Sequence, residues 1–300
     1  MNRRKAEAAL LFNVVIWGVT FQLVKSALHG ISPVLFLAMR FSLAAVALGA
    51  VFGLGARPPA GWQAKAYPAR KLAAGGMIGI FLFAGYLLQT LGLQTTTAPK
   101  SAFLTGLATV MVPLLGALVY QMKPRLAEVA GVLAATLGMG LMTLEGPVGA
   151  IGRMGHGDLL TFGGAVAFAA HVVATGHFAE QIGFEVLSVT QVGAAALSAL
   201  SLVWLVETPR VQWQPMVVWA ILITGLLCTA LAFTIQAWAQ HYTTATRTAL
   251  IYALEPVVAW ITSYCLAGEG LSGRAAAGAA LILSGVLLVE MKPFHARQHL

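Results

Sequence analysis

Long apolar runs alternate with short polar gaps along the whole chain. Ten of the runs reach about the 20 residues that an α-helix needs to cross a bilayer. They occupy residues 7–25, 33–54, 72–94, 99–121, 126–145, 157–177, 184–206, 214–239, 245–267 and 274–291. Glycine, proline and charged residues gather in the gaps, and no gap is long enough for a soluble domain. The pattern predicts an all-α polytopic membrane protein with ten transmembrane helices.

One stretch of this pattern occurs twice. Residues 96–112, TTAPKSAFLTGLATVMV, return in looser form as residues 243–259, TTATRTALIYALEPVVA, at a shift of 147. The same shift also pairs Gln89 with Gln236, Gly131 with Gly278 and Gly138 with Gly285. A run of identities at one shift indicates a duplication. We therefore divide the chain into a first repeat, 1–147, and a second repeat, 148–300.

The number of helices in each repeat predicts how the repeats sit in the membrane. Each repeat holds five of the ten apolar runs. Because five is odd, the second repeat crosses the bilayer in the opposite sense to the first. We therefore expect an inverted repeat around a central cavity. Inverted repeats are typical of secondary transporters, in which the two halves exchange conformations and open one site to either side in turn.

The composition agrees with a membrane protein and excludes a water-covered fold. Hydrophobic residues make up 59% of the chain and charged residues only 9%, whereas soluble domains carry about 25% charged residues. The net charge of +8 would suit nucleic acid, but the basic residues are scattered through the gaps and form no continuous face. We therefore expect the lipid bilayer and a small-molecule substrate as partners, and no nucleic acid.

The positions of lysine and arginine predict the orientation of the chain. When the N-terminus is placed in the cytoplasm, the cytoplasmic gaps hold far more lysine and arginine than the gaps on the other side. This is the distribution that the positive-inside rule describes. Both termini are then cytoplasmic, and the predicted location is the inner (plasma) membrane, which the chain crosses many times.

The sequence contains no motif of an enzyme. A P-loop, a GxSxG nucleophile elbow, an HExxH zinc motif and other metal-ligand clusters are all missing. We therefore expect neither catalysis nor a cofactor. A membrane-embedded lipid enzyme is the alternative from another class, and it would need a clustered acid–base or metal set near one membrane face.

Polar residues inside the apolar runs are the candidates for function, because each is costly in a bilayer. In the run 245–267, Thr248, Tyr252 and Glu255 share one helix face. Glu255 is the acidic residue predicted to lie well inside the hydrophobic thickness, and Pro256 after it weakens the helix. We interpret Glu255 either as a proton-coupling or amine-binding group, or as a hydrogen-bonded residue that stabilises a kinked helix.

The first repeat offers related candidates. Thr105 lies on the matching hydroxyl-bearing face, and Phe103 in the same run is a further candidate for the cavity wall. Gln89 and Gln236 form a matched pair in the third helix of each repeat, and Tyr86 shares the face of Gln89. An amide both donates and accepts hydrogen bonds, so this pair either bridges helices or binds a ligand.

The first helix of each repeat carries an aromatic and polar face. Trp17, Thr20 and Phe21 lie on the face in the first repeat, and at a shift of 151 Phe168 and His171 take the places of Trp17 and Thr20. Such faces suit a cavity that holds an apolar or aromatic ligand. Two other interpretations stay open: Trp17 as an interfacial anchor or core ring, and His171 as a residue that only bonds a neighbour.

Three cations complete the candidates. Lys100 and Arg247 match each other at the start of the fourth helix of each repeat. They are either snorkelling anchors or gates that attract a carboxylate. Arg40 lies inside the run 33–54, where we expect it to pair with an acidic group or a carbonyl.

Short motifs give the chain a resemblance to a known family. Trp17–Gly18 followed by Lys25 resembles the first-helix pattern of the drug/metabolite transporter superfamily, and Leu254–Glu255–Pro256 with Gly268–Glu269 resembles its pattern around the ninth helix. Together with ten helices, a duplication and this length, the motifs resemble the ten-helix exporters made of two EamA domains. One departure is Gln121–Met122–Lys123, which stands where a Gly–Glu pair is expected at the end of the fourth helix.

The resemblance implies a fold and a function. The implied fold has a central cavity lined by the first, third, fourth, sixth, eighth and ninth helices, with the fifth and tenth at the periphery. The implied function is export of small metabolites, namely amino acids and their analogues, with amphipathic drug efflux or another metabolite exchange as alternatives. The aromatic faces favour hydrophobic or aromatic amino acids moved by alternating access, with protons as the candidate coupling ion.

Overall fold

The computed structural model describes residues 3–54, 69–96, 98–120, 125–143, 155–258, 261 and 272–290. Within these residues the chain is helical, and the β-type contact found there is an isolated bridge between Ile31 and Val211. The helices are α1 (Arg3–Gly18), α2 (Thr20–Ala27), α3 (Pro33–Gly49), α4 (Ala69–Leu93), α5 (Ala98–Gly106), α6 (Ala108–Tyr120), α7 (Leu126–Thr143), α8 (His156–Ile182), α9 (Phe184–Val206), α10 (Pro215–Leu222), α11 (Ala232–Ala239), α12 (Ala245–Tyr252) and α14 (Gly273–Glu290). Two π-helical segments, η1 (Ala50–Leu54) and η3 (Ile223–Leu231), extend α3 and join α10 to α11.

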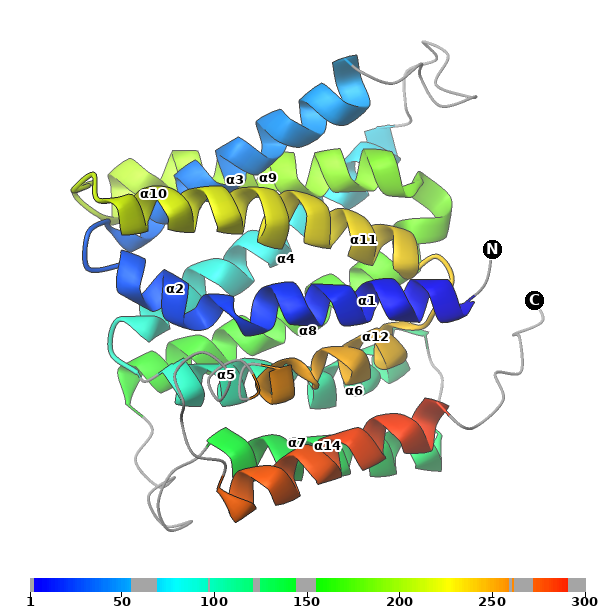
Figure 1. Ribbon diagram of the computed structural model, residues 1–300. Coiled ribbons are helices and arrows are strands. Elements are labelled where there is room, and N and C mark those ends of the chain that lie inside the picture. The colour runs from blue at the N-terminus through cyan, green and yellow to red at the C-terminus, as the bar shows by residue number, and fades with distance from the viewer. Residues whose placement is uncertain are drawn as a thin grey trace.

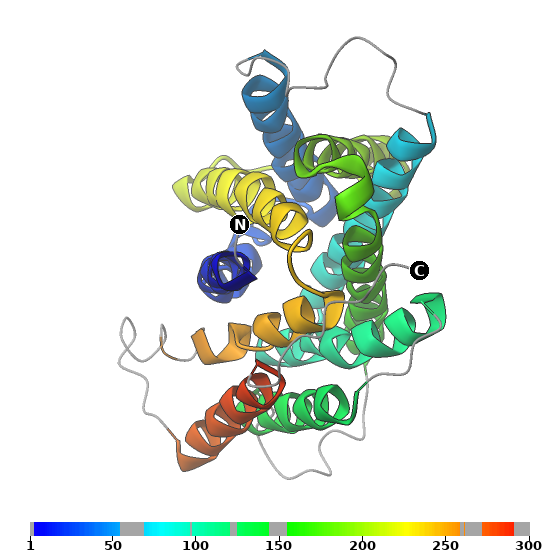
Figure 2. The same ribbon diagram turned by 90° about the vertical axis from the view of Figure 1, so that its right-hand side faces the viewer.

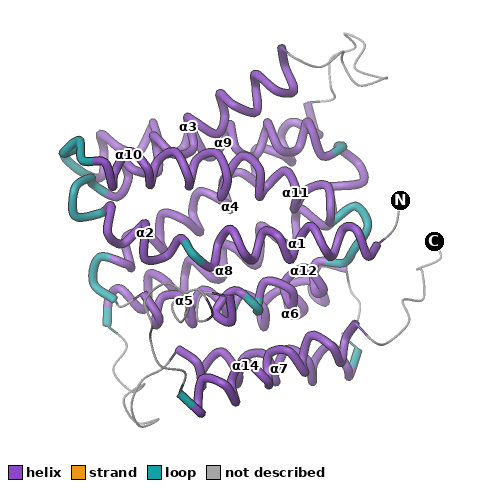
Figure 3. Tube along the Cα trace, viewed as in Figure 1, coloured by secondary structure: helices purple, strands orange, loops and turns teal. Residues whose placement is uncertain are grey.

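The helices lie side by side as a bundle (Figure 1), and short loops connect several of them where the chain is described (Figure 3). In the described part of the chain, seven helical stretches are long and apolar enough to cross a membrane: Arg3–Ala27, Pro33–Gly53, Ala69–Leu93, Ser101–Tyr120, His156–Ile182, Phe184–Val206 and Pro215–Ala239. α7 and α14 contain shorter apolar helices. The expected run 245–267 is described only in part. The structure is therefore that of a polytopic helical membrane protein, and the number of ten crossing helices stays a prediction.

Helices from the two predicted repeats pack closely against each other. α4 packs along α8, α3 along α9, and α7 along α14. Figure 2 shows α1 between the helix formed by α10, η3 and α11 on one side and α12 on the other, and α1 contacts both α11 and α12. One large apolar core joins α3, α4 and α9 through buried side chains that include Phe36, Phe41, Leu82 and Val192. α7 and α14 form an outer layer at one edge of the bundle (Figure 1).

Glycines let α7 and α14 approach each other closely. A Cβ atom added at Gly138 would stand 2.5 Å from the Gly278 carbonyl oxygen, and one added at Gly285 would stand 2.5 Å from the Gly131 carbonyl oxygen. Small residues at such crossings allow backbones to pack where lipid provides no hydrophobic drive. By the shift of 147, Gly131 matches Gly278 and Gly138 matches Gly285. Gly138 therefore packs against Gly278, which is the counterpart of Gly131, and Gly285 packs against Gly131, which is the counterpart of Gly278.

The fourth helix of each predicted repeat is interrupted at a matching position. In the first repeat the interruption lies at Leu107, between α5 and α6. In the second repeat α12 ends at Tyr252, and helix resumes after Leu254, which is the residue that matches Leu107. Pro256 explains the second interruption, because it has no N–H for the Tyr252 carbonyl and its ring clashes with that carbonyl.

We predict that Gly138→Ala lowers the free energy of unfolding by about 1–3 kcal/mol, because the new methyl group has to displace the backbone at Gly278. Gly76→Ala is the matched control, since nothing lies within 4 Å of a Cβ atom added there and alanine favours helix more than glycine does. Thermal unfolding of the two variants in detergent measures the difference. Equal unfolding temperatures for Gly138→Ala and Gly76→Ala would contradict the close contact of α7 and α14.

Candidate functional site

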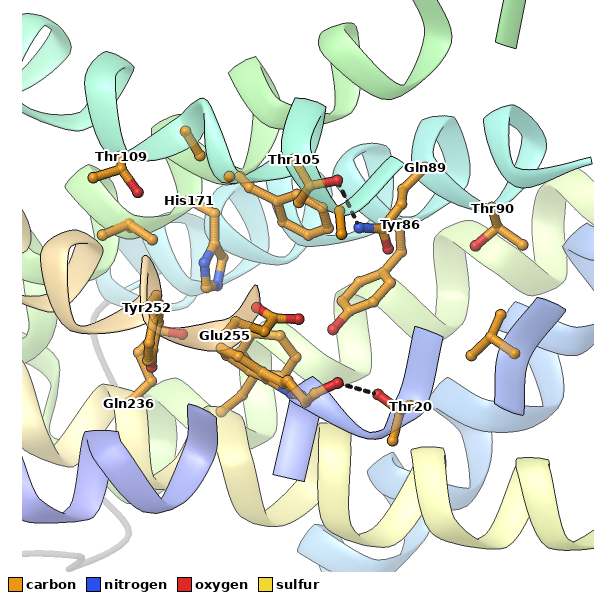
Figure 4. A pocket seen from close by; sticks show the side chains of 18 of the residues that line it. Thr20, Tyr86, Gln89, Thr90, Thr105, Thr109, His171, Gln236, Tyr252 and Glu255 are labelled. Carbon is orange, nitrogen blue, oxygen red and sulfur yellow. Dashed lines mark hydrogen bonds between the residues drawn. The ribbon is translucent and has the colours of Figure 1, made fainter. Parts of the chain in front are cut away.

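A cavity of about 140 Å³ lies inside the bundle (Figure 4). Its wall takes side chains from α1 to α6 in the first predicted repeat, and from α8, α11, α12 and residues 255–256 in the second. Ten of the residues proposed from the sequence line it: Trp17, Thr20, Tyr86, Gln89, Thr105, Phe168, His171, Gln236, Tyr252 and Glu255. The polar and aromatic residues of separate apolar runs therefore come together at one place.

Interrupted helices surround this cavity. Trp17 and Thr20 stand on either side of the break between α1 and α2, and Tyr252 and Glu255 stand on either side of the break after α12. The π-helical segment η3 adds a third irregularity, because its Cys228 carbonyl accepts a hydrogen bond from Trp17 Nε1 at 3.0 Å. Short π segments inside helices occur frequently at functional sites. Three local irregularities of the described bundle thus lie around the cavity.

Aromatic rings form much of the cavity wall. The Trp17 ring lies 4.8 Å from that of Tyr252 and 5.5 Å from that of Phe233. The Tyr86 ring meets Phe168 edge to face at 5.0 Å and Phe233 at 6.1 Å. Edge-to-face pairs at these centroid distances are favourable beyond their buried area. The rings fix one another in place and present an apolar surface to a ligand.

Amides and hydroxyls hold the helices around the cavity. Gln89 Nε2 donates to Thr105 Oγ1 at 2.9 Å, which joins α4 to α5. Gln236 Nε2 donates to Gln240 Oε1 at 3.0 Å. The His171 Nε2 atom lies 2.9 Å from the Gln191 Oε1 atom in a buried hydrogen bond between α8 and α9. Gln89 therefore bridges two helices, His171 hydrogen-bonds a neighbouring residue, and both residues also line the cavity.

Arg40 is the cation of the cavity wall, and its partners differ from those expected. Its side chain is 3% exposed, and its Nε donates to Thr229 Oγ1 at 2.7 Å. The guanidinium carbon stands 4.1 Å from the centre of the Tyr86 ring, a distance typical of cation–π contacts. The expectation of an acidic or carbonyl partner was therefore wrong for the described residues. A hydroxyl and an aromatic face hold this arginine in place.

Glu255 is the anion of the cavity wall. Figure 4 shows its carboxylate pointing toward the group formed by His171, Tyr86 and Tyr252. Within the described part of the chain no hydrogen bond or ion pair to this carboxylate is found. The carboxylate thus faces the cavity and is available to a ligand or a proton.

Four other predicted residues lie outside this wall or cannot be placed. Phe103 packs instead against an apolar cluster shared by α1, α7, α12 and α14. Arg247 is buried away from the cavity, where its Nη1 lies 3.4 Å from Glu7 Oε1 and its Nη2 donates to the Val289 carbonyl at 3.1 Å. This favours a structural anchor that joins α1, α12 and α14. The side chains of Phe21 and Lys100 lie outside the described part of the structure.

The cavity also contains residues that the sequence interpretation did not assign to it, chiefly Arg40, Thr90, Thr109 and Phe233. Thr109 lies four residues after Thr105, and Phe233 lies three residues before Gln236, so helical spacing was the signal for both. Arg40 carried a stronger signal, because a charge inside an apolar run is by itself a reason to suspect function. It was missed because the resemblance placed the second helix outside the cavity wall.

One protein-family model matches nearly the whole chain. It is described as the EamA-like transporter family, and it matches residues 4–144 and again residues 155–291. The two matches fall on the two halves of the chain, one on each side of the gap near residue 150.

Several relatives align over most of their lengths. An uncharacterized transporter of Archaeoglobus fulgidus is 31% identical over 97% of this chain and 88% of its own. A probable terminal-alkyne amino-acid exporter of Streptantibioticus cattleyicolor is 27% identical over 99% of this chain and 97% of its own. A probable amino-acid metabolite efflux pump of Salmonella typhimurium is 26% identical over 99% of this chain and 98% of its own.

A solved crystal structure has a similar fold. It superposes with a TM-score of 0.74 at 21% sequence identity, and the superposition covers 95% of this chain and 96% of that chain. At this level of identity the likeness concerns the fold.

We predict that Thr229→Val destabilises the protein by about 1–3 kcal/mol, because it leaves the buried Arg40 Nε without its acceptor. Thr234→Val is the matched control. The Thr234 hydroxyl donates to the Ala230 carbonyl of its own helix. Removing this hydroxyl therefore leaves no other side chain without a hydrogen-bond partner. Thermal unfolding in detergent compares the two variants, and an equal effect of both would contradict the role of Thr229 in holding Arg40.

Proposed function

The chain belongs to the EamA-like transporter family and is a membrane transporter, and we propose that it exports hydrophobic or aromatic amino acids and their analogues by alternating access. Two relatives support this substrate class, since their descriptions name amino-acid export and amino-acid metabolite efflux. The proposed location is the inner membrane, with both termini in the cytoplasm, as the distribution of lysine and arginine favours.

The size and wall of the cavity carry this proposal. Its volume of about 140 Å³ is close to that of an engineered protein cavity of about 150 Å³ that binds benzene. Pockets for drug-sized ligands are larger, about 300–1,000 Å³. Aromatic rings provide apolar contacts, and hydroxyls, amides and two charges provide polar ones. These features favour one small amphoteric molecule with an apolar side chain over the alternative of a bulky amphipathic drug.

The packing of the helices supports two inverted five-helix repeats. In such an arrangement α3 corresponds to α9, α7 to α14, and the helix α5–α6 to α12. Each of these helices contacts its own counterpart in the structure. The same symmetry makes α1 correspond to α8, and α4 to the helix that ends in α11. The contact of α4 with α8 should therefore recur as a contact of α11 with α1, and both contacts are present. A pseudo-twofold axis of this kind lets the halves exchange conformations around one site.

The interruptions at Leu107 and Leu254 suit this mechanism. They lie at matching positions of the two repeats, next to residues that line the cavity. A hinge needs a few residues that absorb a change of backbone angle. Each interruption divides its helix into two parts. We propose that these parts move relative to each other when the cavity closes to one side of the membrane and opens to the other.

Glu255 is the candidate for ion coupling. In the first repeat its place is taken by Ala108, so the carboxylate is an asymmetric feature of an otherwise repeated helix. A carboxylate inside an apolar bundle is costly without a counter-ion, and within the described residues none contacts it. We propose that a proton neutralises Glu255 during one part of the transport cycle.

Transport assays in proteoliposomes test the proposed substrate class. We expect export of radiolabelled phenylalanine, tyrosine, leucine or isoleucine. We expect a much slower export of glutamate and lysine, because their charged side chains would lie among aromatic rings without a counter-ion. Liposomes without protein provide the background. No export of any amino acid in the panel would refute the proposal, and export of bulky amphipathic dyes alone would favour drug efflux.

The proton coupling is tested by the same assay with and without a pH gradient. For the wild-type protein we expect the gradient to raise the export rate, and for Glu255→Gln we expect the ratio of the two rates to fall to about one, because an amide binds no proton in this range. Glu180→Gln, at an exposed position on α8, should keep the wild-type ratio. An unchanged ratio in Glu255→Gln would show that this residue is not the coupling group.

A further inference from the structure

We propose that Arg40 and Glu255 recognise the two charged ends of one zwitterionic substrate, with Arg40 binding its carboxylate and Glu255 binding its ammonium group. The inference rests on the proposed function, which supplies a substrate that carries both charges. It goes beyond that function because it assigns the orientation of the substrate and the two groups that any transported molecule must carry.

Arg40 has the properties of an anion-binding group. A guanidinium stays protonated at all accessible pH values, and here it is 3% exposed. Among the carboxylates in the described part of the chain, none lies within the 4.0 Å of an ion pair with it. A buried charge without a counter-charge is strongly unfavourable. The wall position of Arg40 means that an anion inside the cavity can provide the missing charge.

The neighbours of Arg40 in the described part of the chain are a hydroxyl and an aromatic ring, and neither is a counter-charge. Thr229 Oγ1 accepts from Nε at 2.7 Å, and the Tyr86 ring lies 4.1 Å from the guanidinium carbon. The remaining four N–H groups belong to Nη1 and Nη2, the pair that binds a carboxylate end-on through two parallel hydrogen bonds. The hydroxyl and the ring thus hold the guanidinium in one orientation without neutralising it.

Glu255 provides the complementary charge in the same cavity. Arg40 and Glu255 both line the wall, yet they form no ion pair with each other within 4.0 Å. The two charges therefore do not neutralise each other, and the proposed ligand bridges them in the cavity that they share. An amino acid carries an ammonium and a carboxylate on neighbouring atoms and satisfies both side chains at once.

This arrangement also explains discrimination between ligands of similar shape. An amine without a carboxylate would leave Arg40 uncompensated, and a carboxylic acid without an amine would leave Glu255 uncompensated. A site with buried polar groups rejects analogues that lack the matching group far more strongly than an apolar site rejects a change of size. The apolar side chain of the substrate then contacts the rings of Trp17, Phe168 and Phe233, which also line the cavity.

The test pairs substrate analogues with variants in proteoliposomes. The substrates are phenylalanine, 2-phenylethylamine, which lacks the carboxylate, and 3-phenylpropionate, which lacks the amine. For Arg40→Gln we expect phenylalanine transport to fall about tenfold or more, while the slow transport of 2-phenylethylamine stays the same or rises, since that analogue has no carboxylate for Arg40 to bind and the variant removes the uncompensated charge. For Glu255→Gln we expect a similar loss for phenylalanine, while the slow transport of 3-phenylpropionate stays the same or rises.

Two controls separate recognition from folding. Arg40→Lys keeps the positive charge and should restore part of the phenylalanine transport. Arg210→Gln, at an exposed loop position, should behave like the wild type with every substrate. Wild-type protein alone provides a second measurement: phenylalanine methyl ester should compete for transport about tenfold less well than phenylalanine, because the ester has lost the anion.

The outcomes distinguish this inference from the proposed function. If the wild-type protein transports no amino acid, the proposed function fails. If it transports phenylalanine, but Arg40→Gln lowers phenylalanine and 2-phenylethylamine by the same factor, Arg40 is a structural residue and the inference is overturned. Equal competition by phenylalanine and its methyl ester in the wild-type protein overturns it as well, whatever the variants do.

Discussion

The absence of water in a bilayer is the constraint on which this structure depends. A polar group there has to find its partner in the protein, because lipid offers none. Several buried polar side chains in the described residues do so: His171 meets Gln191, Gln89 meets Thr105, and Arg247 meets Glu7. Arg40 and Glu255 differ, since neither has a counter-charge among the described residues, and both line the same cavity. We propose that a ligand or a proton in the cavity neutralises these two charges.

The same constraint links the cavity to helix geometry. Helices satisfy their own backbone groups, so breaks in them are tolerated only where other partners or a lined cavity exist. The breaks beside Thr20, Thr105 and Glu255 all lie at the cavity wall, and the carbonyl of Cys228 in η3 finds its partner in Trp17. Away from the cavity, α7 and α14 are continuous and pack through glycines. The described part of the bundle thus combines a closely packed outer helix pair with a central region of interrupted helices, where we propose hinges.

Much of this arrangement followed from the sequence, for physical reasons that can be named. A crossing helix needs a long apolar run, so seven of the expected runs reappear as long apolar helices. Polar residues inside such runs are costly, which is why Gln89, His171 and Glu255 proved to be good markers of the wall. Apolar wall residues carry no such marker: Phe233 was not assigned and Phe103 was placed there, because both resemble core residues until the helix rotation is known. Arg40 was marked by its charge but not assigned to the wall, because the resemblance left its helix out of the cavity; the packing of α3 against α4 and η3 brings it there.

The central claim is that a small zwitterion binds between Arg40 and Glu255 inside the bundle. A structure of the protein determined in complex with a transported amino acid tests this most directly. The account predicts the ligand in the central cavity, with its carboxylate on the Arg40 guanidinium, its ammonium group on Glu255 and its side chain against the rings of Trp17 and Phe233. A ligand bound elsewhere, or bound in the cavity with no contact to either charge, would contradict it.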